Sequence, residues 1–127
     1  MGHTHRPLSP HLQIYKPQLT SVLSITHRGT GVLLALALLV MPYWLLSIAS
    51  GPDTYALLLQ HFSAWYGKLF MFGVIFSVYY HLCNGIRHLG WDLGRGLDLP
   101  STYLTGYIVV FLSVLMTLAT CLWVRMS

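Results

Sequence analysis

Charged side chains are scarce in this sequence, and their scarcity excludes an ordinary water-soluble domain. Only 8% of the 127 residues are charged, whereas 55% are hydrophobic. Soluble domains carry about 25% charged residues, and a small soluble fold has a large surface to cover relative to its core. The length allows one domain, residues 1–127. The composition therefore predicts a single domain embedded in a membrane.

Basic runs are also absent, although the formal net charge is +4. The seven Lys and Arg residues stand singly along the chain, and no groove-forming pattern of stacking aromatic residues accompanies them. We therefore expect no nucleic acid among the partners. Isolated basic residues beside apolar segments are instead typical of topology signals, so membrane lipids are the expected surroundings.

The motifs of soluble redox enzymes are missing as well. The two cysteines, Cys83 and Cys121, lie inside apolar segments without the paired spacing of a zinc or redox site. The sequence contains no GxGxxG motif and no cysteine set for an iron–sulfur cluster. It also contains no CxxCH motif, so any haem would be held without covalent attachment, as haem b. We expect no catalytic residue and no dehydrogenase chemistry in this chain.

Three long uncharged stretches dominate what is present. A helix crosses ~30 Å of hydrocarbon with about 20 residues, and each stretch meets that length together with its flanks. We predict spans at approximately residues 28–49, 63–88 and 103–125, after an N-terminal segment over residues 1–23. Turns are expected at residues 51–53 and 98–101, and Pro42 should kink the first span modestly. The predicted fold class is all-α, with three transmembrane helices.

The distribution of basic residues predicts the orientation. Five lie on the N-terminal side or in the second loop and two on the opposite side: Arg6, Lys16, Arg28, Arg87 and Arg95 against Lys68 and Arg125. This bias predicts a cytoplasmic N-terminus and a periplasmic C-terminus. Residues 1–16 lack the apolar core of a cleavable signal. We expect the bacterial inner membrane rather than the mitochondrial one.

A histidine in the second span requires an explanation, because polar groups inside a membrane are costly unless they are paired or liganded. His81 could be an axial ligand of haem iron, or it could hydrogen-bond a neighbouring helix or a lipid headgroup. His88 lies seven residues later on nearly the same face, offset by ~20°. With Arg87 it lies toward the cytoplasmic end, where haem propionates would emerge. Gly85, one turn from His81, would leave room for a flat ring.

A six-coordinate haem iron needs a second axial ligand, and we predict that this chain does not supply it. The other histidines lie in or just after the N-terminal segment or near the outer end of the second span, so none is expected on another span at the depth of His81. The missing ligand should come from another subunit.

A second group of polar residues lies where the first span begins. If this segment is helical, Ser24 and Arg28 are four residues apart and share a face. A hydroxyl and a guanidinium there could hydrogen-bond the oxygens of a quinone. The alternative is a serine helix cap followed by an interfacial arginine. His27 could meet a haem propionate or lie among headgroups.

Two other classes of protein compete with a cofactor-binding subunit. A small transporter or channel subunit would use His81 and Arg87 on an ion path, but the interiors of the first and third spans carry no ionisable side chains. A purely structural anchor would leave the polar side chains of His81, Asn84 and Arg87 without a role. Detection of haem would separate that anchor from a cytochrome.

Three stretches of the sequence resemble the cytochrome b subunits of succinate dehydrogenase (respiratory complex II). They are RPLSPHLQIYK at residues 6–16, SITHRGTG at residues 24–31 and HLCNGIRHLGWD at residues 81–92. The last stretch matches a family signature that begins with a histidine, continues through glycine, an aliphatic residue and Arg-His, and ends in aspartate. The first stretch is similar to the mitochondrial and α-proteobacterial branch.

This resemblance implies a membrane anchor that forms half of a helical bundle, completed by a second small anchor subunit. That subunit would supply the other ligand of a shared haem b. A flavoprotein subunit would oxidise succinate, and an iron–sulfur subunit would pass the electrons to ubiquinone. By resemblance, His81 is the haem axial ligand and His27 and His88 lie near the propionates. Ser24 and Arg28 line the ubiquinone site.

Overall fold

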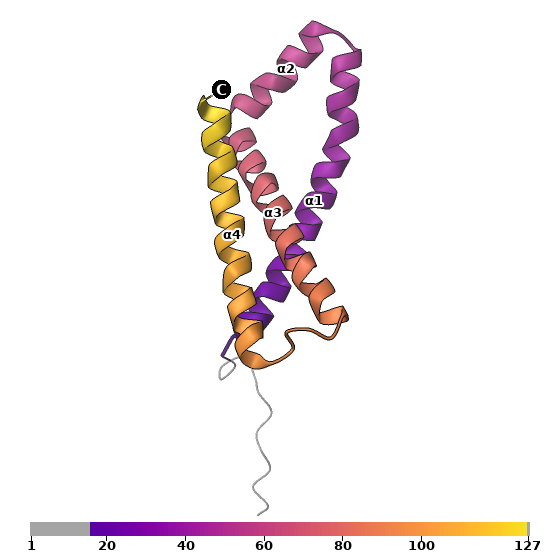
Figure 1. Cartoon of the computed structure of the whole chain (residues 1–127). Helices are drawn as coiled ribbons and strands as arrows, with labels where there is room; N and C mark the ends of the chain where they lie inside the picture. Colours follow the sequence, from indigo (N-terminus) through magenta and orange to yellow (C-terminus); the bar gives the residue numbers. More distant parts are fainter. Residues whose placement is uncertain (1–15, 127) are drawn as a thin grey trace, which may run out of the picture.

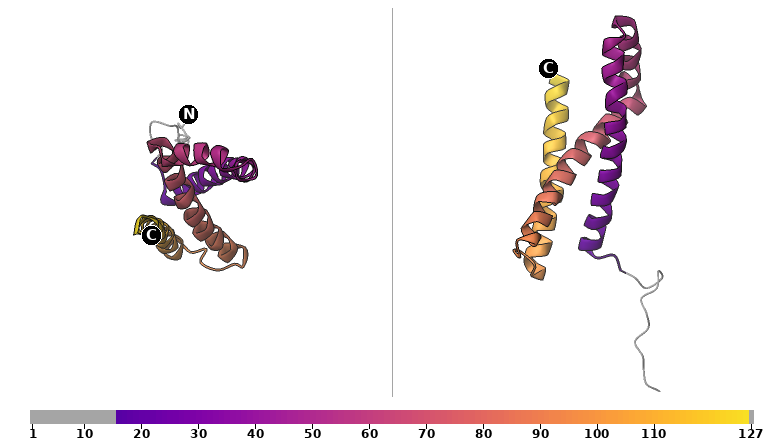
Figure 2. Two further views of the ribbon diagram at one scale, coloured as in Figure 1. Left: turned by 90° about the horizontal axis from the view of Figure 1, so that it is seen from above. Right: turned by 90° about the vertical axis from the view of Figure 1, so that its right-hand side faces the viewer.

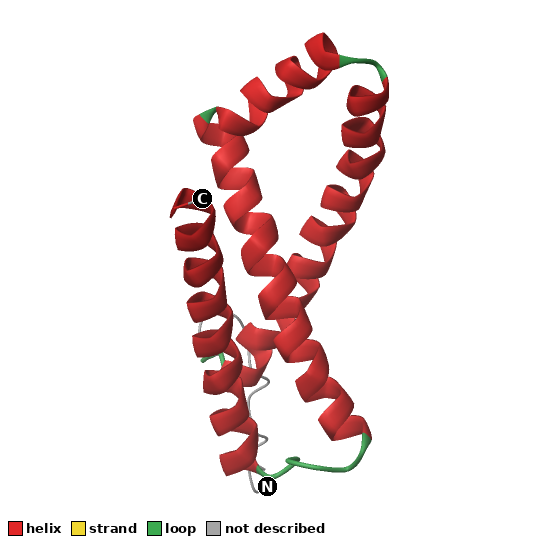
Figure 3. Ribbon diagram, turned by 45° about the horizontal axis from the view of Figure 1, so that its top comes forward, coloured by secondary structure: helices red, strands yellow, loops and turns green. Residues whose placement is uncertain are grey.

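The computed structural model describes residues 16–126, and this part of the chain contains helices and loops but no strands (Figures 1 and 3). The helices are α1 (Leu19–Ala49), α2 (Pro52–Ser63), α3 (Trp65–Asp92) and α4 (Leu99–Met126). Three of them, α1, α3 and α4, are long and apolar enough to cross a membrane. The predicted all-α fold with three membrane-spanning helices is confirmed.

The helices extend beyond the uncharged stretches that mark the predicted spans. Helix α1 begins at Leu19 rather than near residue 28, so His27 and Arg28 lie inside it. A charged residue marks where a span meets the interface, and a helix can continue past that level with its polar groups in the headgroup region. Pro42 also lies inside α1, which continues to Ala49.

Helix α4 begins at Leu99, within a stretch predicted as a turn. The Asp98 carboxylate accepts a hydrogen bond from the backbone N–H of Ser101 at 3.0 Å. This bond satisfies one of the free N–H groups in the first turn of the helix. Hydrogen bonds from Ser101 lower the pKa of the exposed Asp98 carboxyl, because they favour its charged form.

The short helix α2 was not predicted. Gly51 turns the chain with φ of +109°, a conformation that favours glycine, and Pro52 then begins the helix. Proline suits the first helical position because the N–H it lacks would have no intrahelical partner there. Figure 1 shows α2 bridging the ends of α1 and α3. A Cβ atom at Gly67 would collide with the His61 backbone, so only glycine permits this approach of α2 to α3.

Helix α3 is the centre of the arrangement: it packs most extensively against α4 and α1 and also contacts α2, whereas α1 makes smaller contacts with α2 and α4. It crosses α1 and runs beside α4 (Figures 1 and 2). The start of α1, the end of α3 and the start of α4 lie at one end of the molecule, and α2 lies at the other (Figure 1). The up-and-down course of α1, α3 and α4 thus gathers residues 19–31, 80–92 and 99–106 toward this end of the molecule.

Polar side chains fill much of the interior, and apolar side chains cover the outside. Buried polar residues include Ser77, Asn84, Ser113 and Thr117, whereas large apolar residues along α1 and α4 are exposed. Small polar residues allow close helix packing in membranes, where apolar side chains gain little by facing inward. The exposed faces therefore suit lipid or the helices of another membrane subunit.

Candidate functional site

Three histidine rings from two helices gather at the end of the molecule opposite α2. His81 on α3 stacks on His27 of α1, with ring centroids 3.9 Å apart and an interplanar angle of 16°. The ring of His88 lies 5.1 Å from that of His27, tilted by 53°. All three residues are half-buried. The structure thus brings together the three histidines that the sequence singled out for a haem site.

The presence of His27 beside His81 corrects one expectation. We predicted no histidine at the depth of His81 on another span, and this is wrong, because α1 begins early enough to carry His27 within the helix. Two rings stacked face to face at this distance leave no space for a macrocycle between them. In this arrangement they do not form the two axial ligands of one iron.

The nitrogen Nδ1 of His81 faces α1. It lies 3.2 Å from the backbone carbonyl oxygen of His27 and 3.3 Å from the hydroxyl oxygen of Thr30. The other ring nitrogen, Nε2, has no hydrogen bond to any residue that the structure describes. A Cβ atom at Gly31 would lie 3.2 Å from Cε1 of His81, so this glycine lets the ring approach α1 closely.

Thr30 and Gly31 were missed by the sequence analysis, which considered Gly85 instead. A Cβ atom at Gly85 would meet nothing within 4 Å, so no part of the described chain uses the space beside it. The available signal was the position of Thr30 and Gly31 three and four residues after His27, on the same helix face. The residue of α3 that Thr30 and Gly31 contact depends on how α1 and α3 cross.

Haem b fits the chemistry of these residues. The neutral imidazole of a histidine binds iron through one nitrogen while the other donates a hydrogen bond. In His81, Nδ1 is hydrogen-bonded to α1, and Nε2 has no hydrogen-bond partner among the described residues. Nδ1 of His27 is buried without a hydrogen-bond partner among the described residues, as expected where a polar group from outside the chain approaches. Residues 16–126 hold no group of three or more His, Cys, Asp or Glu side chains suited to a bare metal ion.

The side chain of Arg87 reaches from α3 to α4. Its guanidinium donates from Nε to the Thr105 hydroxyl at 3.1 Å, from Nη1 to Asn84 Oδ1 at 3.3 Å and from Nη2 to the Thr102 carbonyl at 3.0 Å. Its carbon Cζ also lies 4.0 Å from the centre of the Trp91 ring, a cation–π contact. Only 8% of the residue is exposed. Arg87 therefore joins α3 to α4.

The two residues predicted for a quinone site lie on α1 beside the histidine cluster. Ser24 is half-buried and Arg28 is exposed. The segment is helical, as their proposed sharing of a face requires. An exposed guanidinium at this end of α1 is accessible to a ligand or to another subunit.

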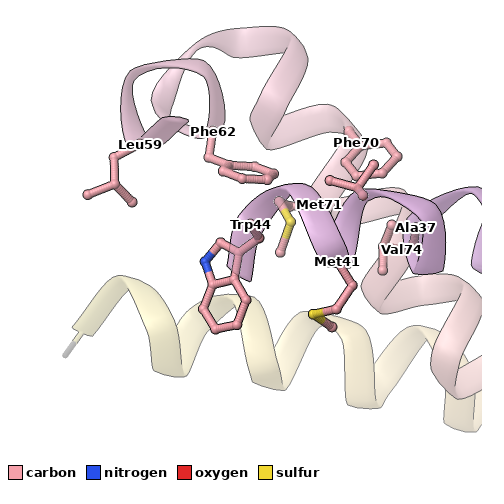
Figure 4. A pocket seen from close by; sticks show the side chains of 9 residues that line it. Ala37, Met41, Trp44, Leu59, Phe62, Phe70, Met71 and Val74 are labelled. Carbon is pink, nitrogen blue, oxygen red and sulfur yellow. The ribbon is translucent and has the colours of Figure 1, made fainter. Parts of the chain in front are cut away.

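A separate cavity of about 450 Å³ lies between α1, α2 and α3, away from these polar groups (Figure 4). Its lining is apolar and consists of Ala37, Val40, Met41, Trp44, Leu59, Phe62, Phe70, Met71 and Val74. None of the predicted site residues lines it. The cavity therefore offers space but no polar chemistry.

Fold and site together define a multi-pass membrane protein with three spans and a histidine cluster at one end. The sequence matches the family described as "Succinate dehydrogenase/Fumarate reductase transmembrane subunit" over residues 3–120. The chain therefore belongs to this family, and the resemblance noted from its motifs is confirmed.

Individual relatives agree with this assignment. The chain is 43% identical to the succinate dehydrogenase cytochrome b556 subunit of Rickettsia felis, over 96% of this chain and 94% of the relative. It is 41% identical to the cytochrome b560 subunit of Reclinomonas americana, over 90% and 83% of the two chains. The human mitochondrial cytochrome b560 subunit is 39% identical, over 88% and 68%.

Proposed function

We propose that this chain is the cytochrome b anchor of a succinate dehydrogenase and that it holds haem b together with a second membrane subunit. The observation that carries the proposal is the pairing of His81 with α1 through Nδ1, which leaves Nε2 for iron. Membership of the family supports the same role. A bound haem b would supply a one-electron redox centre within the membrane.

In this proposal His81 is the axial ligand, and the second ligand belongs to the companion anchor subunit. The Nδ1 of His27, which has no hydrogen-bond partner among the described residues, and the nearby ring of His88 would hydrogen-bond the propionates. The exposed apolar faces of α1 and α4 offer the surface on which the companion subunit would complete the bundle.

The ubiquinone site belongs to the same end of the molecule. Ser24 would orient the quinone through a hydrogen bond, and the positive charge of Arg28 would favour its reduced, partly anionic form. The iron–sulfur subunit would cover this end, with the flavoprotein subunit beyond it, and the whole complex would reside in the bacterial inner membrane. The chain's own task is to bind, orient and anchor.

The division of roles can be tested on the complex purified through a tag on this chain. We expect the flavoprotein, iron–sulfur and second anchor subunits to copurify. Arg28→Ala should lower succinate:ubiquinone reductase activity at least about tenfold, because it removes a charge-assisted hydrogen bond to the quinone. The rate at which the complex reduces a soluble dye should stay near the wild-type value, and so should the haem content. Neither the reduction of the dye nor the binding of haem depends on Arg28 in this proposal.

The exposed Lys68 near the opposite end of α3 provides the control. Lys68→Ala should leave both activities unchanged. Equal loss of quinone reduction and haem in Arg28→Ala would contradict the separate roles of Arg28 and the histidines.

A further inference from the structure

Thr30 contacts His81 although no role has been assigned to it so far. It lies on α1 three residues after His27 and is buried, with 6% of the residue exposed. Its hydroxyl oxygen is 2.8 Å from the His27 carbonyl oxygen and 3.3 Å from Nδ1 of His81. Nδ1 is itself 3.2 Å from the same carbonyl oxygen. The three polar atoms form a closed triangle between α1 and α3.

The chemistry of these atoms determines where the hydrogens lie. A backbone carbonyl oxygen can only accept, so both the Thr30 hydroxyl and Nδ1 of His81 must donate to it. A hydroxyl has one hydrogen, and Thr30 directs that hydrogen to His27. The Thr30 hydroxyl oxygen therefore faces Nδ1 with its lone pairs. Because both neighbours of Nδ1 are acceptors, the neutral ring carries its hydrogen on Nδ1 and its lone pair on Nε2.

We infer that Thr30 is a positioning residue which, with the His27 carbonyl, holds His81 in the tautomer whose Nε2 can bind haem iron. This inference rests on the proposed function, in which His81 is the axial ligand. The His27 ring, stacked 3.9 Å away, and the absence of a side chain at Gly31 fix the plane of the imidazole against α1. Residues 27–31 thus form a socket for His81.

The hydroxyl of Thr30 should affect the haem in two measurable ways. Groups that hydrogen-bond a metal-ligating histidine typically contribute about 10–100-fold to metal affinity and raise the basicity of the ligand. Thr30→Val keeps the shape of the side chain and removes the hydroxyl. We expect it to weaken haem retention about tenfold or more. The midpoint potential should become more positive, because a less basic imidazole stabilises ferric iron less.

Two further variants separate the hydroxyl from its surroundings. Thr30→Ser retains the hydroxyl and should restore wild-type haem retention and potential. Thr26→Val, one turn earlier on α1, removes a hydroxyl that donates to the Val22 carbonyl at 2.9 Å. It should leave both haem properties unchanged. If Thr30→Val does not assemble, Thr30→Ala removes the same hydroxyl and makes the same prediction with a smaller side chain.

The experiment is a potentiometric titration of the haem α band in the purified complex, together with the haem released to an excess of apomyoglobin. The inference is supported if Thr30→Val or Thr30→Ala shifts the midpoint potential and increases the release of haem while Thr30→Ser and Thr26→Val do neither. Equal values in all Thr30 variants, or an equal shift in Thr26→Val, would overturn it. His81→Ala distinguishes the failures: unchanged haem in that variant would refute the ligand assignment itself, whereas lost haem beside unaltered Thr30 variants would refute only the role of Thr30.

Discussion

At the scale of single residues, the ring of His81 on α3 is held by groups of α1, which accept hydrogen bonds from Nδ1 and allow a close approach. A histidine in an apolar helix has few acceptable environments, so it could be singled out without a structure. Its partners, the His27 carbonyl, Thr30 and Gly31, belong to another helix. A backbone carbonyl has no signature in a sequence. Which face of α1 meets which face of α3 depends on how the two helices cross, and one sequence does not specify that. The roles of the histidines, Ser24 and Arg28 stay predictions.

The contact of Gly31 with His81 leads to a prediction with an internal control. A Cβ atom at Gly31 would lie 3.2 Å from Cε1 and 3.6 Å from Nδ1 of His81, so Gly31→Ala should push the imidazole away from α1. We expect the haem content of the purified complex to fall by about one half or more. Substitution of residues that orient a metal ligand typically lowers the affinity for the metal by ~10-fold or more. The measurement is a pyridine haemochrome assay against protein content.

Gly29 provides the matched substitution, because a Cβ atom there would meet nothing within 4 Å. Gly29→Ala makes the same change in helix propensity on the same helix and should leave haem content unchanged. A similar loss in both variants would show that α1, rather than the contact with His81, is responsible.

At the scale of helices, charge gaps predicted the number of spans correctly, and the helices themselves extend beyond the predicted spans. Helix α1 continues toward the N-terminus past Arg28, because a helix can carry charged groups at the interface. Helix α2 escaped prediction because its Gly51-Pro52 start is equally typical of a turn. The pattern identified a break in the chain but not that a helix follows it.

The hydrogen bonds of Arg87 predict which substitution loosens the packing of α3 on α4. Arg87→Lys retains the charge but cannot reproduce the planar fork that reaches Thr102, Thr105 and Asn84. We expect it to destabilise the complex by on the order of 2 kcal/mol, since hydrogen bonds from charged groups contribute about 1.5–3 kcal/mol each. Thermal denaturation in detergent would measure this change.

Arg95, an exposed cation in the loop after α3, is the control. Arg95→Lys should leave the denaturation temperature unchanged. If Arg87→Lys is as stable as Arg95→Lys, the bonds between α3 and α4 contribute little to stability.

At the scale of the whole molecule, composition predicted the environment, and the packing explains why this chain needs partners. Small polar residues occupy its interior, while apolar faces of α1 and α4 remain exposed. The membrane class, the three spans and the family were all accessible from the sequence. The orientation remains a prediction, since the arrangement of helices is the same whichever side the N-terminus faces.

Topology reporters test that orientation. The excess of basic residues on the side of the N-terminus and second loop predicts that a C-terminal alkaline phosphatase fusion is active and a C-terminal green fluorescent protein fusion is dark. Fusions placed after Gly94, in the loop between α3 and α4, should behave in the opposite way. An active phosphatase after Gly94 would reverse the assignment.

The most direct test of the central claim is a dithionite-reduced minus oxidised absorption spectrum of the complex purified through this chain. We predict a b-type α band with haem near one per copy of the chain. The band should be lost or altered in His81→Ala and retained in His61→Ala, whose histidine lies on α2 and contacts Tyr66. An unchanged band in His81→Ala, or no band in the wild-type complex, would contradict the account and leave His81 as a structural histidine.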